Sequence, residues 1–570
     1  MRLVALASLP LLLSINFSQG QTAQAWDIVI NEVLPDPSPP QSLPNNEFIE
    51  LKNVSSTSIN LRNWKISDGS STATINSSII LEKDSFLILC PSSALNSFQN
   101  LGRTVGLANF PSLNNDADII TLYSAEGRVI HSIGYTIEWF HGSIKSEGGW
   151  SLEMIDDNNP CGEFNNWKPS EDRSGGTPGK QNSIASTNID EDLPVLLRAY
   201  SPDPFSLIAV FNESLDSSSL VFSEFLIEGR TVRSVTAIAP LFKELKLSLT
   251  DSLKTNEVIT LTVKKISDCA GNQVGSFNKA KAGRPGQADS MDIVINEILF
   301  NPPSDGYDYI ELYNRSNKIL DLDDLVLSSI GSTGSITRST ALSSTDWLFF
   351  PGEFLAFSTN TTWVSKNYTV KAPESILQIN DMISLPDDKG HFGIFNRSGK
   401  RIDAVQYQQQ WHFPLLSTKE GVSLERINAN GISQDPGNWT SASGDAGFGT
   451  PGYTNSQTAG TQALKGGVTV EPKVFSPNFD GRDDFAFIRY QFEQPGFIAS
   501  VTIYDGNGRL VRTLEYNQRL SETGQWRWDG LNDFSYPLGA GIYIISIDLF
   551  DLKGNRRKIK TPVVIAKTTK

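Results

Sequence analysis

Residues 27–37 read DIVINEVLPDP, and residues 292–302 read DIVINEILFNP. Shortly after each stretch comes a second matched pair, EFIELKN at 47–53 and DYIELYN at 308–314. Internal repeats have to be identified first, because a missed repeat leads to the wrong fold. The spacing is far longer than the period of a solenoid, so the sequence predicts a duplicated domain of about 150 residues.

Two more stretches recur in the same order. GWSLEMI (149–155) returns as GVSLERI (421–427), and SGGTPGKQNS (174–183) returns as GFGTPGYTNS (447–456). A strand that slips by one residue turns its core side chains outward, so ordered repeats of this kind indicate a shared strand register. We therefore expect the two copies to have the same strand order.

Between the repeated motifs the chain shows short strands separated by turns. FIELKN (48–53), SFLILC (85–90) and DIITLY (118–123) are apolar or alternating runs bounded by turn-forming residues. No amphipathic helical stretch is longer than about three turns. Strands at such short, regular spacing predict an all-β chain built from β-sandwiches.

The repeated motifs together resemble the lamin-tail domain. The resemblance rests on the opening IVINEV, on IELKN and IELYN followed by INLRNW and LDLDDL, on the closing GTPG, and on a repeated Tyr–Trp spacing. The spaced pairs are Tyr135 with Trp139 and Tyr407 with Trp411. The resemblance covers about 26–183 and 291–456, and it implies an Ig-like β-sandwich in each, a module that bacteria use in secreted multidomain proteins.

The segment between the copies, 190–283, resembles the Ig-like domains of bacterial surface-layer proteins. The similarity lies in V-F-x-E-x-L-D and, some fifty residues later, D-x-A-G-N. The residues that carry it are Val210, Phe211, Glu213, Leu215 and Asp216, then Asp268, Ala270, Gly271 and Asn272. We interpret DCAGN as a closing turn in which Gly271 and Asn272 suit positive φ.

The last segment, 467–570, resembles the Ig-like domain of flagellar hook-capping proteins and the C-terminal sorting domains of gliding and surface proteins of the Bacteroidota. VTIYDGNGRLVRTL (501–514), WDG and GAGIY carry the resemblance. The opening phrase supplies Pro477, Asn478, Asp480, Gly481 and Asp484. Phe479 stands where the sorting domains usually have Gly, and their W-G signature is missing, so export by the type IX route stays an open alternative.

These resemblances imply a tandem array of four Ig-like β-sandwich domains. The predicted boundaries are 1–25 signal peptide, 26–183 lamin-tail domain 1, 190–283 surface-layer-type domain, 291–456 lamin-tail domain 2 and 467–570 hook-capping or sorting-type domain. Segments 184–190, 284–290 and 455–467 are rich in small and polar residues and are predicted linkers.

The amino-terminal residues predict export. MRLVALASLPLLLSINF is too short to span a bilayer, and Ala23-Gln24-Ala25 is a small-x-small cleavage site. No later stretch reaches the roughly 18 apolar residues of a membrane span, and no lipoprotein-type Cys follows the apolar run. We expect cleavage near Ala25 and an extracellular or outer-surface location.

The net charge limits the kinds of partner that we expect, and the cysteine count limits the possible disulfides. The net charge of −15 disfavours a phosphate-binding nucleic-acid surface, so the expected partners are cell-surface or extracellular glycans or proteins. The sequence leaves the oligomeric state open. Three cysteines are too few for a disulfide scaffold. Cys90 and Cys161 of the first repeat are either bridged in an oxidising compartment or two free buried thiols, with Cys269 left over.

The motifs do not predict an enzyme. The chain has no H-E-x-x-H, G-x-S-x-G or P-loop motif, and its only histidines are His131, His141, His391 and His412. The carboxylates that we expect to matter in both copies are Glu32 and Glu297 of the NE pairs with Glu50 and Glu311 of the IEL runs. Paired carboxylates can cleave glycosides, but on half-buried strands we expect them to be hydrogen-bonded to the backbone of an adjoining turn.

Two sets of residues are candidate binding sites. The tryptophans Trp64, Trp139, Trp150, Trp167, Trp411 and Trp439 either fill sandwich cores or form a glycan platform, and Trp64 and Trp150 have no partner in the other copy. In SPNFDGRDDF (476–485) the oxygen ligands Asn478, Asp480, Asp483 and Asp484 surround a glycine, which suits Ca²⁺. The alternative for that loop is a capped turn.

The sequence therefore favours a secreted, non-enzymatic structural or adhesion protein of the cell surface, whose last domain serves export or attachment. An extracellular carbohydrate-binding protein is the main alternative, and an uncharacterised hydrolase with carboxylates between domains is a weaker one. Exposed tryptophans in a groove would favour the former alternative, and two carboxylates in a cleft would favour the latter.

Overall fold

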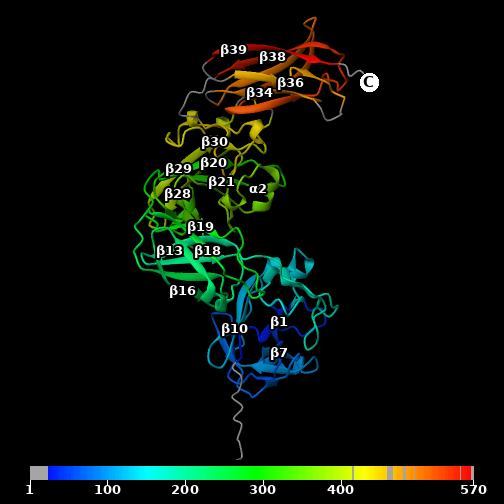
Figure 1. The fold of residues 1–570 in the computed structure, drawn as a ribbon, viewed down its shortest axis with the longest axis vertical. Helices are drawn as coiled ribbons and strands as arrows, with labels where there is room; N and C mark the ends of the chain where they lie inside the picture. The colour runs from blue at the N-terminus through cyan, green and yellow to red at the C-terminus, as the bar shows by residue number, and fades with distance from the viewer. Residues whose placement is uncertain are drawn as a thin grey trace, which may run out of the picture. The chain divides into compact units, whose positions relative to one another are not determined.

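The computed structural model confirms that the chain is all-β (Figure 1). It describes residues 23–413, 416, 418–458, 467–478, 483–492, 495–551 and 554–566. The α-helices of this described part are the short α1 (Leu95–Phe98) and α2 (Thr361–Asn367). No helix of the described residues is long and apolar enough to cross a membrane.

The first repeat consists of two main sheets with one core between them. The larger sheet has the order β12 (Trp167–Pro169), β11 (Leu152–Met154), β1 (Ile28–Leu34), β2 (Phe48–Asn53), β7 (Phe86–Pro91), β8 (Thr104–Leu107). The smaller has the order β10 (Val129–Thr136), β9 (Ala117–Tyr123), β4 (Lys65–Ser67), β5 (Thr72–Thr74), and β3 (Ile59–Asn60) pairs with β6 (Ile80–Leu81). Side chains of both sheets, such as Ile30 and Ile120, share one buried cluster.

The second repeat has the same strand order, as the matched motifs predict. Its larger sheet runs β31 (Trp439–Ser441), β30 (Leu424–Arg426), β20 (Ile293–Leu299), β21 (Tyr309–Asn314), β26 (Phe354–Ser358), β27 (Ile376–Gln378). Its smaller sheet runs β29 (Arg401–Gln408), β28 (Lys389–Asn396), β23 (Leu325–Ile330), β24 (Ile336–Ala341), and β22 (Leu320–Asp321) pairs with β25 (Leu348–Phe349). Even the register break in the first strand recurs, at Ile30/Glu32 and at Ile295/Glu297.

The segment after the first repeat also has two sheets. One has the order β13 (Leu196–Asp203), β14 (Ser206–Phe211), β17 (Glu244–Leu249), β16 (Val232–Ile238), and the other β15 (Glu224–Ile227), β18 (Val258–Lys264), β19 (Lys279–Gly283). DCAGN forms the predicted turn, in which the backbone N–H of Asn272 donates to Oδ1 of Asp268 at 2.8 Å. Gly271 has the expected positive φ of 93°, but Asn272 does not, because its side chain instead bonds back to Asp268.

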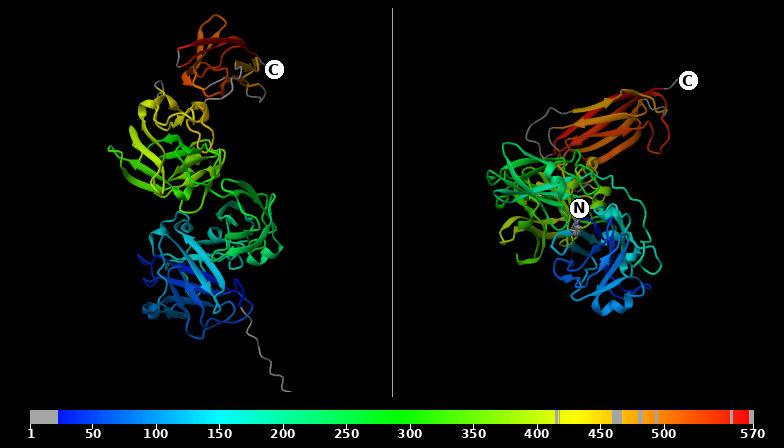
Figure 2. Two further views of the ribbon diagram at one scale, coloured as in Figure 1. Left: turned by 90° about the vertical axis from the view of Figure 1, so that its left-hand side faces the viewer. Right: turned by 60° about the horizontal axis from the view of Figure 1, so that its bottom comes forward.

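The last segment is a further pair of sheets. One has the order β32 (Gly467–Glu471), β34 (Ala486–Gln491), β37 (Thr523–Trp528), and the other β33 (Val474–Phe475), β39 (Arg556–Ile565), β38 (Gly541–Phe550), β35 (Ile498–Asp505), β36 (Leu510–Arg519). Their inward side chains form a separate core that contains Trp526, Trp528 and Tyr543. Two further views show strands in each coloured portion of the chain, from blue to red (Figure 2).

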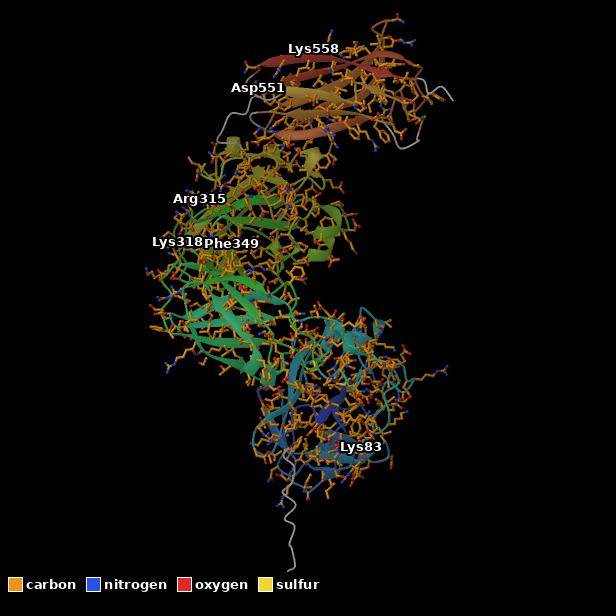
Figure 3. The ribbon with its side chains drawn as sticks, viewed as in Figure 1. Lys83, Arg315, Lys318, Phe349, Asp551 and Lys558 are labelled. Atoms are coloured by element: carbon orange, nitrogen blue, oxygen red, sulfur yellow. A yellow bond between two sulfur atoms is a disulfide. The ribbon has the colours of Figure 1, made fainter. Side chains whose placement is uncertain are left out.

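By its internal contacts the chain divides into two compact units. The first contains residues up to 252 with 259–281, and the second contains 253–258 with 282–570. Two of the predicted linkers, 184–190 and 284–290, are held by polar contacts to the repeats; in the third, 455–467, residues 459–466 lie outside the described residues. In the first unit Ser186 N donates to Ile155 O at 3.0 Å. In the second, Lys318, labelled in Figure 3, lies 2.6 Å from Asp289 and 2.7 Å from Asp292.

The disulfide differs from the pairing considered from the sequence. Cys161 is bonded to Cys269, with 6.1 Å between their Cα atoms, and Cys90 is a free, buried thiol. A Cys90–Cys161 bridge is therefore wrong, because Cys90 lies on β7 inside a small core that includes Phe48 and Phe98. Cys269, which the sequence left over, closes the bond from the DCAGN turn.

We predict that replacing both bridged cysteines by Ser lowers the stability of the first unit by about 3 to 5 kcal/mol, because the bond closes a long loop in the unfolded chain. The two cysteines are 108 positions apart. Denaturant unfolding measures the loss, and peptide mapping without reductant identifies the bond. Recovery of a peptide that joins Cys90 to Cys161 would contradict the assignment.

Candidate functional site

Three glutamates lie side by side in each repeat, on one face of its larger sheet. Glutamate row 1 is Glu32, Glu50 and Glu153, and glutamate row 2 is Glu297, Glu311 and Glu425. Within each row the central residue, on β1 or β20, stands directly opposite the other two. All six side chains are 0% exposed. Cross-strand neighbours of this kind have adjacent side chains, so each row gathers three carboxyl groups away from water.

A β-bulge in the first strand of each repeat brings the row into register. Ile30 pairs with Leu51 and Glu32 pairs with Glu50, so Asn31 is the inserted residue without a cross-strand partner. The freed Asn31 side chain donates to Oε1 of Glu50 at 3.1 Å. An inserted residue re-aims the side chains that follow it. The repeated Asn-Glu pair is therefore the sequence signature of this bulge.

The GTPG stretch of each repeat covers its row. We name residues 174–184 closing segment 1. Backbone N–H groups of this segment donate to each carboxyl group of row 1: Thr177 to Glu32 at 2.7 Å, Gly179 to Glu50 at 2.5 Å and Ile184 to Glu153 at 3.3 Å.

Closing segment 2, residues 447–457, repeats the arrangement. Thr450 N donates to Glu297 at 2.9 Å, Gly452 N to Glu311 at 2.6 Å and Gln457 N to Glu425 at 2.8 Å. The glutamates accept backbone N–H groups, as expected, but the donors to the central glutamates lie 145 and 153 residues along the chain and not in the turn that adjoins the strand. Glu153 and Glu425 are additions that sequence reasoning missed, although SLEMI and SLERI carry them in both copies.

The first glycine of each GTPG stretch is required by close approach. A Cβ atom on Gly176 would lie 2.5 Å from Oε1 of Glu32, and one on Gly449 would lie 2.7 Å from the hydroxyl of Tyr309. Contacts this short force something to move, so only glycine lets the backbone reach the row. The carboxyl groups are thereby sealed from any substrate.

The residue before the bulge donates its backbone N–H to a histidine in one repeat and to the aspartate of an ion pair in the other. Ile30 N donates to Nδ1 of His131 at 2.8 Å, and burial lowers the pKa of His131 to about 4. The matching Ile295 N donates to Oδ2 of Asp403 at 2.9 Å. Asp403 carries a charge that His131 lacks, and it lies 3.5 Å from the buried guanidinium of Arg426. Met154 occupies the position of Arg426 in the first repeat.

We predict that His131→Asp destabilises the first unit by about 3 kcal/mol or more, because it buries a carboxylate with no partner. Adding Met154→Arg should restore a measurable part of that loss, because it recreates the ion pair of the second repeat. A double-mutant cycle from denaturant unfolding gives the coupling. If the stability losses of the two single variants simply add in the double variant, the two side chains do not interact as a pair.

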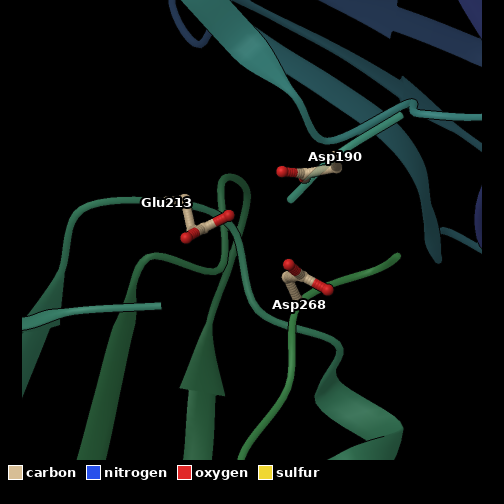
Figure 4. Close-up of side chains that lie close together, drawn as sticks. All are labelled: Asp190, Glu213 and Asp268. Carbon is tan, nitrogen blue, oxygen red and sulfur yellow. The ribbon is translucent and has the colours of Figure 1, made fainter. Parts of the chain in front are cut away.

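Three acidic side chains converge at another place in the first unit. Figure 4 shows Asp190, Glu213 and Asp268 directed toward one another from three separate segments. One carboxylate oxygen from each lies within 4.8 Å of the others. Burial and the charges of Asp268 and Asp190 raise the pKa of Glu213 to about 8. We name these three residues the acidic triad.

The acidic triad has the chemistry of a hard-cation site but not a full ligand set. Ca²⁺ takes six to eight oxygen ligands, so three carboxylates would need several more. The sequence did not single out this cluster as a site, although V-F-x-E and D-x-A-G-N supply Glu213 and Asp268. Asp190 comes from outside both motifs, and only the fold brings it to them.

The predicted calcium loop is described only in part. Asn478, Asp483 and Asp484 lie in the described residues, and Asp480 lies outside them. Ser476 N donates to Asp483 O at 2.8 Å, and Asn478 N donates to Ser476 O at 2.8 Å. Asp484 is buried and Asp483 is exposed. The calcium site and the capped turn both stay predictions.

We predict that millimolar Ca²⁺ raises the melting temperature of the full chain, because a ligand that binds only the folded state stabilises it. Asp480→Ala should abolish a rise that comes from the terminal loop, and Asp268→Asn is the matched variant for the acidic triad. Calorimetry measures the shift. Unchanged melting with Ca²⁺ would leave the loop as a capped turn.

Most of the candidate tryptophans belong to the cores. Trp139, Trp167 and Trp439 are buried, as core packing predicts, and so is Trp64 at 4% exposed. Trp64 is therefore corrected from a candidate contact residue to a core residue. Trp150 is half-buried, and the amino group of Lys145 lies 4.4 Å from the centre of its ring.

The comparison with protein families gives one match, to the lamin tail domain over residues 21–136. No curated protein sequence matches this chain. Several solved structures are similar at low sequence identity. One is the S-layer protein rSbsC(31-844), 12% identical, which covers 66% of this chain and 54% of its own, with a TM-score of 0.15.

Two more are PorZ, a surface component of the type-IX secretion system of Porphyromonas gingivalis, and a Ca²⁺-stabilized adhesin of an Antarctic bacterium. PorZ is 10% identical, with 92% of this chain and 74% of PorZ covered and a TM-score of 0.18. The adhesin is 9% identical, with 95% and 99% covered and a TM-score of 0.12. This chain spans 40% of the N-terminal SbsC structure. Similarities at these TM-scores carry no argument, so residues 21–136 are what the comparisons connect to a family, the lamin tail domain.

Proposed function

We propose that this chain is a secreted, non-enzymatic structural or adhesion protein of the cell surface, built from four Ig-like sandwiches at the predicted boundaries. One observation carries the proposal most directly. The carboxyl groups that recur in both lamin-tail repeats are fully buried and bonded to backbone N–H groups of the closing segments. They hold a rigid module together and are not available for acid–base catalysis.

Two further observations and one prediction support a place outside the cell. The first residues have the pattern of a signal peptide. The Cys161–Cys269 bond suits an oxidising compartment. Calcium binding, if the terminal loop holds it, suits an environment rich in that ion. We further propose that the last segment, 467–570, serves export or attachment.

Carbohydrate binding is the second candidate, and the side-chain positions weaken it. Flat aromatic rings in a groove would support sugar stacking. Among the described residues, however, no tryptophan belongs to the exposed large apolar side chains. Of the candidate tryptophans, Trp150, whose ring lies beside Lys145, is the one best placed to stack on a sugar.

We predict that cell fractionation finds the protein at the outer surface or in the medium, with a mature end near Trp26. Sequencing of both ends of the mature protein measures signal cleavage and shows whether 467–570 is retained. Protease treatment of intact cells, with a cytoplasmic protein as the control, tests exposure. Recovery of the uncleaved chain in the cytoplasm would contradict the proposal.

A further inference from the structure

One threonine in each repeat occupies a position that two ionised carboxylates could not share. In row 2 the hydroxyl oxygen of Thr450 lies 2.8 Å from Oε2 of Glu297 and 2.9 Å from Oε1 of Glu425. A hydroxyl has one hydrogen to donate and two lone pairs that accept. It can therefore satisfy one of these oxygens, and the other must carry a hydrogen of its own.

The same geometry occurs in row 1. The hydroxyl oxygen of Thr177 lies 2.8 Å from Oε1 of Glu153 and 3.4 Å from Oε2 of Glu32. The other oxygen of each central glutamate already accepts a backbone N–H, from Thr177 or Thr450. In row 2, Oε1 of Glu425 can also accept from the hydroxyl of Ser456 at 3.1 Å, so Oε2 of Glu297 is the atom whose surroundings fit a proton. Oε2 of Glu32 is the matching atom of row 1.

The groups around the rows do not supply enough positive charge to replace that proton. In row 1 the cation that acts on Glu50 is Lys52 on β2, whose amino group is paired with Asp157. Lys180 of closing segment 1 is paired with Asp172. Burial without a compensating cation makes a charged carboxylate costly.

Row 2 faces three tyrosines and one arginine. Tyr309 donates to Oε1 of Glu297 at 2.6 Å, and Tyr368 and Tyr453 lie near the same row. The buried Arg519 interacts with Glu425, and its Nε donates to Oε1 of Gln457 at 3.3 Å. One guanidinium among three carboxyl groups still leaves an excess of negative charge if all three ionise.

We propose that each repeat holds a buried proton on its central glutamate, Glu32 or Glu297, and that loss of this proton in alkaline solution releases the closing segment. In the closed state the central Oε2–H donates to the threonine hydroxyl, and that hydroxyl donates to Glu153 or Glu425. On deprotonation the proton passes to hydroxide in solvent, giving water. The row then holds three carboxylates and one hydrogen too few for the threonine contacts.

The direction of the pH dependence follows from burial. Desolvation raises the pKa of Glu50 to about 8 and that of Glu425 to about 8, and it places the pKa of Glu32 well above its usual range. A raised pKa in the folded state means that protonation favours folding. The contribution is therefore fully present below about pH 4.3, the ordinary pKa of glutamate, and is lost as the pH rises through the raised pKa values of the row.

Release matters because of what each closing segment leads into. Closing segment 1 continues directly into residues 184–190 and so into Asp190 of the acidic triad. Closing segment 2 contains Gln457, which holds Arg519 of the last segment. A change in row protonation would thus alter how the repeat holds its neighbouring segments, without any change in the sandwich cores.

Hydrogen exchange of the full chain tests the release. Protection factors, corrected for the pH dependence of intrinsic exchange, are compared at about pH 6 and about pH 9.5. We expect them to fall at least about tenfold in 174–184 and 447–457, and to be retained in the core strands β9 and β28. Protection that is unchanged in both closing segments, or lost equally in the core strands, would overturn the proposal.

A matched pair of variants tests the position of the proton. In E32Q the carboxamide nitrogen can donate to Thr177 but cannot ionise, so in alkaline solution closing segment 1 should lose less protection than it does in the unmodified chain, while closing segment 2 loses as much. E297Q should give the reverse, and each molecule contains its own control. An alkaline loss in the segment that faces the Gln equal to the loss in the unmodified chain would overturn the proposal.

Infrared spectroscopy of the unmodified chain provides a test that does not depend on a variant. A buried carboxylic acid has a C=O stretch distinct from that of a carboxylate. We expect this band at neutral pH and its loss over the same pH range as the loss of protection. Absence of the band at neutral pH would contradict a protonated glutamate in either repeat.

Discussion

The bonds between the backbone N–H groups of the closing segments and the buried glutamate rows organise both repeats. Each row links three adjacent strands on one side and one irregular segment on the other. A buried carboxyl group is costly unless its lone pairs are satisfied. The closing segment can therefore take only the path that presents its N–H groups to the row, and this constraint explains why GTPG and the NE pair recur together.

The two repeats show which parts of this arrangement can vary. The first copy has His131 with Met154 where the second has Asp403 with Arg426. In each copy the histidine or the aspartate accepts a backbone N–H of the bulged strand. Tyr309 donates to the second row, where the first repeat has Phe48. The glutamates, the threonine and the close glycine are the same in both copies: the first two make the hydrogen bonds of the row, and the glycine lets the backbone approach it.

The first unit is constrained by a different device. The Cys161–Cys269 bond joins the first repeat to the DCAGN turn, and Lys243 is paired with Glu163 near the same bond. The acidic triad lies at this junction, since Asp268 precedes Cys269 directly. A covalent link directly beside Asp268 fixes the position of the segment that carries this carboxyl group.

The sequence by itself determined the duplication, the all-β class and the shared strand order, because period-two patterning and ordered motifs depend on local spacing alone. It also indicated that the NE and IEL glutamates would bond to a turn. It did not determine the third glutamate of each row, the Cys161–Cys269 pairing or the position of Asp190. Nor did it place Trp64, whose burial depends on both sheets. Those features join residues far apart in the chain, so only the tertiary structure, which sets the distance between segments, could decide them.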